Sequence, residues 1–481
     1  MVGITSIGAY IPRYRLSRQE IGKMWQARVA PGERSVAGYD EDAITMAVAA
    51  SLECMRHNQP DGLYLATTTA PYKEKQGAAI VASATDIHKR THTTDFTNTL
   101  RAATAAMKAA IDAVKGGSAK GLLVVASESR MGAPKGRFEQ TIGDGAAAIM
   151  IGEDAPLAII EGSYSVFSDF TDLWRTEEDR FIQSGEGRFI EEAGYMPIMT
   201  EAINELMAKY SFTPRDFTKA VFYAPDNRNH ANLAKALGFQ KGQVQDTLFD
   251  QIGNTGTVAA LIMLISALEE AAPGDRILFA GYGDGADAFI LRITENISRI
   301  KCSPSMKDRL AASIPIDYGR YLLWRDLIPT ETSSLPERPE ASLAARWREQ
   351  RHIMALYGYR CKRCATPQIH PLGQRIRVCC VCQTKDEFED YRFSDKKGRL
   401  FTYAIDHLQP TKNPPGLNGV VDFEGGGRLI CELTDYDLDK VSIGMPVEMT
   451  FRRLSYSKGI VNYFWKAKPL RGREGHRYGD H

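Results

Sequence analysis

The chain has 481 residues, and its 60 Lys and Arg residues nearly balance its 59 Asp and Glu residues, leaving a formal net charge of +1. This balance removes a general electrostatic attraction for nucleic acid or an anionic membrane. No apolar run reaches the roughly 18 residues of a membrane-spanning helix, and the N-terminal stretch lacks the pattern of a signal peptide. The sequence therefore predicts a cytoplasmic protein of two or three domains, without nucleic-acid or membrane partners.

Residues 1–155 are expected to alternate strands and helices around one small-residue helix. The stretch 95–115, DFTNTLRAATAAMKAAIDAVK, opens with polar residues and continues as an alanine-rich helix that can approach other backbones closely. The N-terminus of such a helix favours developing negative charge, yet the residue at its entrance is Leu100, which cannot act as a nucleophile. The other elements expected in this half are strands over 2–8, 62–69, 121–128 and 143–152 and helices from about 18, over 42–57 and over 78–85.

Residues 156–295 repeat the ending of the first half. The stretch from Gly253, GNTGTVAALIMLISALEEA, is again a buried helix opened by small polar residues, and two apolar strands follow it. Two copies of one pattern predict a duplicated α/β fold with two equivalent sheets. The irregular segment 165–200 is rich in aromatic and charged residues, and a loop this long in a compact domain is expected to cover a functional region.

Four of the eight cysteines form two C-x2-C pairs, Cys361 with Cys364 and Cys379 with Cys382. Four thiolates at this spacing match tetrahedral Zn(II), and with every position filled by sulfur the ion would be structural. Free or redox-active thiols are the alternative. The remaining cysteine of this region, Cys380, has the wrong offset for a ligand.

The C-terminal part changes character after residue 295. Five short strands split by Gly, Pro and Asn predict a small antiparallel barrel of the OB type, which can bind nucleic acid when joined to a zinc ribbon. Few basic residues cluster in the barrel, which disfavours that role. The expected divisions are two half-domains over 1–155 and 156–295, a linker with a helix over 296–355, a zinc ribbon over 356–387, an OB barrel over 388–470 and a polar tail over 471–481.

Several stretches together carry a family resemblance: MVGITSIGAYIPRYRLSRQEIGKMW, PGERSVAGYDEDAITMAV, TTTAPY, DLWRTEEDRFIQSGEGRF and IGNTGTVAALIMLISALEEAAPGDRILF. Residues 1–295 closely resemble 3-hydroxy-3-methylglutaryl-CoA synthases of the archaeal type, in the thiolase superfamily. Residues 318–468 resemble the zinc-ribbon and OB-fold proteins that accompany thiolase-like enzymes. The resemblance implies a five-layered αβαβα core, a homodimer or higher homo-oligomer, and a coenzyme A thioester as substrate.

Three of the four catalytic residue types of these synthases are absent from the matching positions. The acyl-accepting cysteine corresponds to Leu100, the acid/base glutamate to Thr68 and the histidine to Tyr223, whereas the asparagine of the G-N-T turn is retained as Asn254. The resemblance therefore predicts that this chain is not a standard hydroxymethylglutaryl-CoA synthase.

An enolate-stabilising site needs an acid, a base and an oxyanion hole, but no acyl-enzyme. We therefore expect an enzyme that forms or breaks a carbon–carbon bond on an acyl-CoA, by an aldol or retro-aldol reaction without a cysteine intermediate. Some cysteine-free thiolase relatives with zinc–OB partners are aldolases with tyrosines near the reacting carbon. Two alternatives remain open: a catalytically inactive scaffold that binds CoA thioesters or an active thiolase, and acyl transfer or thioester hydrolysis by a non-cysteine route.

The candidate residues each have a plainer structural alternative, such as a core aromatic, a turn residue or a solvated loop. Tyr223 would be the acid/base group and Asn254 the oxyanion donor. Neither Cys54, at a helix end, nor Cys302, in the linker, is expected to replace the missing nucleophile. The remaining catalytic candidates are His230, Tyr282 and Thr68, and the candidate substrate-binding residues are Leu100, Asp226 and Arg228.

Overall fold

The computed structural model describes residues 1–56, 58–300, 304–331, 342–370 and 374–470. The chain divides into two compact units, one of Met1–Ala82 with Ile87–Tyr321 and one of Ser83–Asp86 with Leu322–His481. Cys302 and the predicted tail over 471–481 lie outside the described residues. Every helix of the described part is too short or too polar to cross a bilayer.

A nine-stranded sheet frames the first unit, in the order β11-β12-β13-β8-β1-β7-β6-β4-β5. The join between β1 and β8 spans two residue pairs, Gly3–Ile159 and Ile4–Ala158, whereas the strands within each half pair along most of their length. The sheet thus consists of two halves, which correspond to the two predicted sheets. Its strands are β1 (Gly3–Tyr10), β4 (Gly62–Ala66), β5 (His92–Phe96), β6 (Gly121–Glu128), β7 (Gly145–Gly152), β8 (Ala158–Phe167), β11 (Lys219–Phe222), β12 (Arg276–Tyr282) and β13 (Gly285–Ile293).

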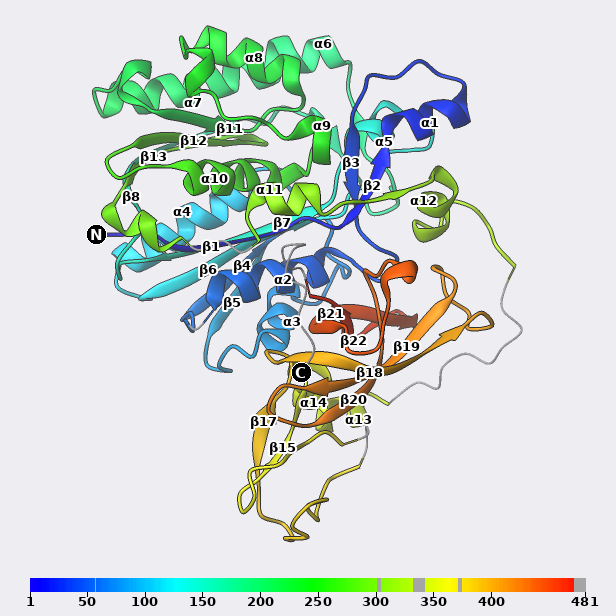
Figure 1. The fold of residues 1–481 in the computed structure, drawn as a ribbon. Helices are drawn as coiled ribbons and strands as arrows, with labels where there is room; N and C mark the ends of the chain where they lie inside the picture. The colour runs from blue at the N-terminus through cyan, green and yellow to red at the C-terminus, as the bar shows by residue number, and fades with distance from the viewer. Residues whose placement is uncertain (57, 301–303, 332–341, 371–373, 471–481) are drawn as a thin grey trace. The chain divides into compact units, whose positions relative to one another are not determined.

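Two helices lie between the halves of the sheet and two cover its outer faces. Helix α4 (Ala102–Lys115) contacts β4, β6, β7 and β12, and helix α10 (Ala259–Glu270) contacts β1, β7, β11 and β12. Helix α2 (Ala43–Met55) packs on β1, β6 and β7, and helix α7 (Met196–Lys209) packs on β8, β12 and β13. These elements form the five layers visible in Figure 1, as predicted for an αβαβα fold. The buried alanines of α4 allow its backbone to approach both halves.

The central helix begins close to its predicted entrance at Leu100, since α4 starts at Ala102. The polar opening of this stretch overlaps a strand, because His92–Phe96 form β5, which pairs in parallel with β4. The carboxylate of Asp95 accepts hydrogen bonds from the backbone N–H groups of Gly77 and Ala78, at 2.6 and 2.7 Å. Asp95 therefore anchors the start of helix α3 (Gly77–Ala84) instead of opening α4.

The first part of the expected linker over 296–355 belongs to the first unit. Strand β14 (Ile314–Ile316) pairs in parallel with β2 (Tyr14–Ser17), which also pairs with β3 (Glu33–Val36), so these residues form a three-stranded sheet. The helix predicted within this linker is present as two short helices, α13 (Leu343–Arg348) and α14 (Gln350–Ala355). The further helices of the chain are α1 (Arg18–Trp25), α5 (Arg137–Thr141), α6 (Gly187–Phe189), α8 (Asn227–Ala236), α9 (Phe249–Ile252), α11 (Met306–Ala311) and α12 (Tyr318–Trp324).

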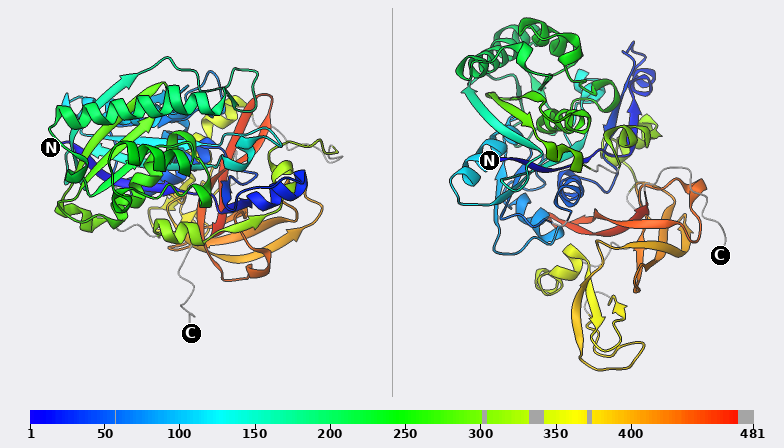
Figure 2. Two further views of the ribbon diagram at one scale, coloured as in Figure 1. Left: turned by 90° about the horizontal axis from the view of Figure 1, so that it is seen from above. Right: turned by 60° about the vertical axis from the view of Figure 1, so that its left-hand side comes forward.

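The second unit contains the predicted five-stranded OB barrel, in the order β20-β19-β18-β21-β22. A bridge between Leu433 and Ala467 brings the two ends of this sheet together, and the rings of Phe451 and Trp465 pack in its interior, 5.5 Å apart. These strands are the orange and red arrows of Figure 2. Their bounds are β18 (Lys397–Asp406), β19 (Gly416–Phe423), β20 (Arg428–Glu432), β21 (Pro446–Ser457) and β22 (Ile460–Pro469), and a small sheet of β15 (Tyr357–Cys361), β16 (Pro367–Gln368) and β17 (Phe388–Arg392) precedes them.

Candidate functional site

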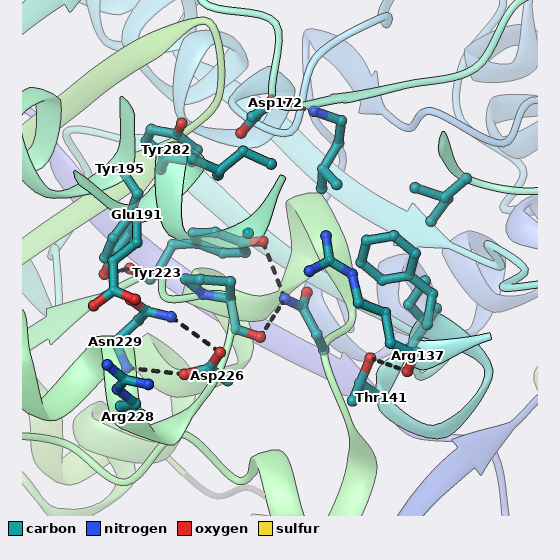
Figure 3. A pocket seen from close by; sticks show the side chains of 18 of the residues that line it. Arg137, Thr141, Asp172, Glu191, Tyr195, Tyr223, Asp226, Arg228, Asn229 and Tyr282 are labelled. Carbon is teal, nitrogen blue, oxygen red and sulfur yellow. Dashed lines mark hydrogen bonds between the residues drawn. The ribbon is translucent and has the colours of Figure 1, made fainter. Parts of the chain in front are cut away.

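A cavity of about 610 Å³ lies in the first unit. Its walls come from the ends of β11 and β12, from the turn before α10 and from the segment that follows β6. The irregular segment predicted to cover a functional region also lines it, through Asp172, Leu173, Ile182 and residues of the π-helical turn Ile190–Tyr195. Figure 3 shows Tyr223, Tyr282 and Asp172 grouped around this cavity.

Tyr223 and Asn254 form the polar centre of the cavity. Tyr223 follows the last residue of β11, and its buried hydroxyl accepts a hydrogen bond from Asn254 Nδ2 at 3.0 Å. The same amide nitrogen donates to the Pro225 carbonyl at 3.2 Å, and Asn254 Oδ1 accepts from the Gly256 N–H at 2.9 Å. A backbone N–H can only donate, so the Gly256 contact fixes which end of the amide faces Tyr223.

This arrangement leaves the hydroxyl proton of Tyr223 available. The Tyr223 oxygen accepts from Asn254, and none of the hydrogen bonds in the described part of the chain takes the phenolic proton. Burial raises the pKa of Tyr223, although the nearby Arg130 guanidinium and the Asn254 hydrogen bond act in the opposite direction. Tyr223 is therefore a neutral proton donor near pH 7. Both amide hydrogens of Asn254 are engaged, so Asn254 holds Tyr223 in place.

Two further tyrosines surround Tyr223. Tyr282, the last residue of β12, stacks on Tyr223 with ring centroids 6.1 Å apart and an interplanar angle of 11°. The Tyr195 hydroxyl donates to the Tyr223 carbonyl at 2.8 Å, and its ring meets Tyr282 edge-on. Burial raises the pKa of Tyr282, and so does its hydrogen bond to Asp172. Burial also raises the pKa of Asp172. The cavity is thus lined by aromatic rings whose hydroxyls are protonated at neutral pH.

Glu128 and Arg130 are site-related residues that the sequence did not single out. Glu128 ends β6 and is completely buried, and burial raises its pKa against the effects of Arg130 and Thr68. Its carboxylate accepts from the Thr68 N–H at 2.7 Å and from the Thr68 hydroxyl at 2.9 Å. Arg130 lines the cavity and reaches Asn254 Oδ1 at 3.4 Å. The signal in the sequence was a carboxylate at the end of a strand that is apolar apart from Ser127.

Three of the predicted site residues lie away from the cavity lining. Thr68 binds Glu128 as described, and Leu100 is half-buried and packs against the core. His230 is buried against the ring of Phe222, with centroids 4.6 Å apart, and burial lowers its pKa to about 4. The structure thus brings together Tyr223, Asn254 and Tyr282 but not His230, Thr68 or Leu100.

Arginines gather around the rest of the cavity. Arg137, Arg188 and Arg228 all line it and are exposed. Asp226 also lines the cavity, and its carboxylate caps α8 by accepting from the Asn229 N–H at 2.8 Å. Asp226 therefore fixes the first turn of the helix that carries Arg228. Side chains of this kind can bind the phosphates of a nucleotide-like ligand.

The predicted metal ligands come together in the second unit. The ligand atoms of Cys361, Cys364, Cys379 and Cys382 all lie within 4.8 Å of one another, with Sγ–Sγ distances of 3.6 Å for Cys361–Cys382 and 3.5 Å for Cys364–Cys379. A tetrahedron of Zn–S bonds of about 2.3 Å places sulfurs about 3.8 Å apart, so this set fits zinc. Cys380 is exposed and outside the set.

The two cysteine pairs have the same local geometry. The Cys361 N–H donates to the Thr366 carbonyl at 3.0 Å, and the Cys379 N–H donates to the Thr384 carbonyl at 2.9 Å. The residue after each second cysteine, Ala365 and Gln383, has a φ of 59°. Two equivalent turns therefore present their thiols to one point.

Comparison with known sequences identifies the family. The hydroxymethylglutaryl-CoA synthase of Methanopyrus kandleri is 33% identical in an alignment of 336 positions that covers 66% of this chain and 96% of that protein. The corresponding synthase of Methanosarcina mazei is 34% identical over 338 residues, 97% of its length. The chain belongs to the hydroxymethylglutaryl-CoA synthase family. Two domain models also match parts of the chain. The model of the C-terminal domain of 3-oxoacyl-[acyl-carrier-protein] synthase III matches residues 207–293. The model of the C-terminal OB-fold domain of ChsH2 matches residues 391–452.

Solved structures share the fold of the first unit. A hydroxymethylglutaryl-CoA synthase complexed with CoA aligns with a TM-score of 0.62 and 20% identity, over 71% of this chain and 94% of that one. The 3-oxoacyl-[acyl-carrier-protein] synthase III of Aquifex aeolicus aligns with a TM-score of 0.55 and 23% identity, over 61% of this chain and 100% of that one. These structures establish the thiolase-like fold of this family member.

Proposed function

We propose that the protein forms or cleaves a carbon–carbon bond in an acyl-CoA thioester, by an aldol or retro-aldol reaction that uses no cysteine acyl-enzyme. Membership of a family named for hydroxymethylglutaryl-CoA synthesis supports a CoA thioester as substrate. The CoA-bound relative with the same fold supports it as well. No cysteine is among the described residues that line the cavity, and Leu100 occupies the position that resembles the family's nucleophile.

The proposal depends mainly on Tyr223. Asn254 donates a hydrogen bond to its hydroxyl oxygen inside the cavity, and this leaves the phenolic proton free for a substrate. In the cleavage direction, a base removes the β-hydroxyl proton of a β-hydroxyacyl-CoA and the Cα–Cβ bond breaks. The electron pair then passes to the thioester oxygen as an enolate. Tyr223 donates a hydrogen bond to this oxygen, and protonation of Cα completes the shorter acyl-CoA. The synthetic direction reverses these steps.

The cavity arginines would hold the CoA part of the substrate. Arg228 is exposed at the lining, and within the described part of the chain no ion pair occupies it. Arg137 donates to Ser184 Oγ at 2.6 Å, and Arg188 pairs with Glu192 at 2.8 Å, so these two are already held beside the cavity. Guanidinium groups match phosphate oxygens in geometry and charge. Arg228 is the best candidate for this contact, with Asp226 orienting its helix.

Product analysis by mass spectrometry tests this function directly. Purified protein is incubated with a panel of β-hydroxyacyl-CoA thioesters, and separately with acyl-CoA plus aldehydes or ketones. We expect an aldehyde or ketone plus a shorter acyl-CoA in the first case, or the condensation product in the second. Absence of turnover in both directions, with CoA binding intact, would instead identify a thioester-binding scaffold.

We also propose that the four cysteines hold a structural zinc ion in the second unit. The matched turns and the sulfur spacing support this assignment, and four sulfur ligands leave no position for substrate. Two neighbouring residues provide a controlled test, since Cys379 belongs to the cluster and Cys380 does not. We expect Cys379→Ser to lose the zinc measured by elemental analysis and to cost the second unit about 4 kcal/mol or more of stability. Cys380→Ser should change neither; equal zinc content in both variants would contradict the assignment.

The family resemblance further suggests a homodimer or higher homo-oligomer. In support, β5 ends the nine-stranded sheet, and all five of its residues are at least partly exposed. An end strand with free backbone groups is a template for pairing with a second chain. Sedimentation equilibrium should give twice the chain mass or a multiple of it, and a monomer at working concentration would contradict this proposal.

A further inference from the structure

Four of the described residues that line the cavity are carboxylates, and three of these hold the helical turns around it. Both carboxylate oxygens of Asp226 accept hydrogen bonds from the first turn of α8, at 2.8 and 3.0 Å. Glu191 accepts from Asn232 at 3.1 Å, and Glu192 pairs with Arg188 at 2.8 Å. Each of these three side chains therefore has a structural partner, and the fourth carboxylate differs from them.

Asp172 is the fourth carboxylate, and within the described part of the chain no arginine or lysine forms an ion pair with it. Its Oδ1 atom accepts from the Leu173 N–H at 2.5 Å, and its carboxylate accepts from the Tyr282 hydroxyl. Figure 3 shows Asp172 and Tyr282 side by side at the cavity. An ionised carboxylate can accept about four hydrogen bonds, so these two leave capacity for a hydroxyl group of a ligand.

The backbone around Asp172 is fixed on both sides. The Gly185 N–H donates to the Asp172 carbonyl at 3.2 Å, which extends the pairing of β9 (Leu173–Trp174) with β10 (Gln183–Ser184). Before Asp172 in the chain, the Ser168 N–H donates to a carbonyl of the turn between β12 and β13 at 3.1 Å. These contacts hold the segment against the end of β12, so the position of the Asp172 carboxylate is set by the fold.

The surroundings of the Asp172 carboxylate suit a group that takes up and releases a proton. Burial raises its pKa above the ordinary value of 3.8, and the charge of Asp284 adds to this effect. The hydrogen bonds from Leu173 and Tyr282 act in the opposite direction and favour the ionised form. Burial is also the main cause of the raised pKa of Tyr223, and the Asp172 charge contributes to it. The carboxylate and the Tyr223 phenol therefore act across the same cavity.

We propose that Asp172 is the general base, which removes the β-hydroxyl proton of the substrate and returns it to Cα. This proposal rests on the proposed function. As the carboxylate takes the hydroxyl proton, the hydroxyl oxygen becomes the carbonyl oxygen of the aldehyde or ketone and the Cα–Cβ bond breaks. The electron pair of that bond passes to the thioester oxygen beside Tyr223 as an enolate. The protonated Asp172 then donates its proton to Cα, so that one proton moves from the hydroxyl to Cα and the reaction balances.

Exchange of Cα hydrogens with D2O tests the base without requiring carbon–carbon cleavage. By reversal of the last step, ionised Asp172 removes a Cα proton from a simple acyl-CoA, for which acetyl-CoA and propionyl-CoA are the probes. Mass spectrometry measures the deuterium that each probe takes up. We expect the wild-type protein to exchange at least one probe faster than buffer does, and Asp172→Asn to be slower by about 100-fold or more. Exchange of both probes only at the buffer rate, or an Asp172→Asn rate within about threefold of the wild-type rate, would overturn the proposal.

Two neighbouring variants separate a base from a residue that only positions Tyr282. Tyr282→Phe keeps the Asp172 carboxylate and removes one of its hydrogen bonds, so we expect exchange to slow by no more than about tenfold. Equal losses in Tyr282→Phe and Asp172→Asn would show that the carboxylate acts through the tyrosine and would overturn the proposal. Asp284→Asn is the matched control, because Asp284 is an exposed carboxylate near Asp172 that does not line the cavity. Its exchange rate should stay within about threefold of the wild-type rate, and a loss as large as that of Asp172→Asn would contradict the assignment to Asp172.

Two failures can be told apart with the same preparations. Exchange at Cα that depends on Asp172, without cleavage or condensation of any substrate in the panel, would refute the proposed reaction and support Asp172 as the base. Conversely, carbon–carbon cleavage that Asp172→Asn leaves within about threefold of the wild-type rate would support the proposed reaction and overturn the assignment of the base. Thermal melting of each variant verifies that it is folded.

Discussion

The entrances of the two central helices differ sharply although their sequences follow one pattern. Before α4, the half-buried side chain of Leu100 packs against the core, and Asp95 is occupied with α3. Before α10, Asn254 makes hydrogen bonds to Tyr223, Pro225 and Gly256 and lines the cavity. Duplication of a supersecondary unit therefore does not duplicate its chemistry. The groups that we propose to react come mainly from the second half, and the first half contributes the buried pair of Glu128 and Arg130.

The largest expected loss of activity is that of Tyr223→Phe. This substitution removes the hydroxyl that Asn254 holds at the entrance of α10 and preserves the aromatic ring. We expect kcat to fall by about 100-fold or more, the usual range for loss of a general acid. Steady-state kinetics on the substrate identified by product analysis measures this, and a melting curve controls for folding. Tyr282→Phe is the matched variant on the stacked ring and should cost less. An unchanged kcat in Tyr223→Phe would contradict the proposal that the α10 entrance is reactive and the α4 entrance is not.

Asn254→Ala should have a smaller effect, because the Tyr223 hydroxyl remains and loses only the bond that positions it. We expect kcat to fall by about tenfold to thirtyfold, equivalent to one positioning hydrogen bond. A larger loss than in Tyr223→Phe would show that Asn254 itself, and not the phenol, stabilises the enolate.

His230 offers a pH test of the same region. Burial lowers the pKa of His230 from 6.5 to about 4 in the folded chain. The neutral imidazole therefore makes its full contribution to the free energy of unfolding above pH 6.5, and this contribution is lost as the pH falls toward 4. The loss should amount to about 1–3 kcal/mol and should be absent from His230→Phe. Denaturant unfolding at pH 7 and pH 4.5 measures it. Near-normal kcat at pH 7 in this variant would agree with a position outside the cavity, and a 100-fold loss would restore His230 as a catalytic candidate.

The smallest effect on rate is expected at the α4 entrance. Leu100→Cys introduces a thiol where the family resemblance suggests a nucleophile, but Leu100 is not part of the cavity lining. We expect kcat to change by less than about threefold and the new thiol to stay unmodified by a CoA thioester. Intact-protein mass spectrometry reads this result. Rapid acylation of the variant would place Leu100 in the site after all.

Most of the fold could be predicted because its periodicity is strong and local. Strands such as β6 and helices such as α1 begin within about two residues of their predicted positions, and the five OB strands were all anticipated. The contact of Asp95 with the start of α3 was not predicted, because it joins residues 17 and 18 positions apart that strand pairing brings together in space. The pairing of β14 with β2 was missed for a related reason, since it joins residues about 300 positions apart in the sequence.

The candidate site could be predicted only where a side chain follows a strand end directly. Tyr223 directly follows a strand and Tyr282 ends one, so their place in the cavity could be predicted from the sequence. The roles of Glu128 and Arg130 depend on which strands are neighbours and on the space left by Gly256, and neither is a local property. The assignment of the family's catalytic positions to Leu100 and Thr68 stays a prediction from the resemblance.

The most direct test of the central claim follows the protein's own mass during turnover. A β-hydroxyacyl-CoA that is cleaved by the enzyme would be quenched at short times, with products and intact protein measured in the same sample. We predict that the shorter acyl-CoA and the aldehyde or ketone appear while the protein retains its unmodified mass. A protein species heavier by one acyl group, formed and consumed at the rate of turnover, would contradict carbon–carbon bond chemistry without an acyl-enzyme.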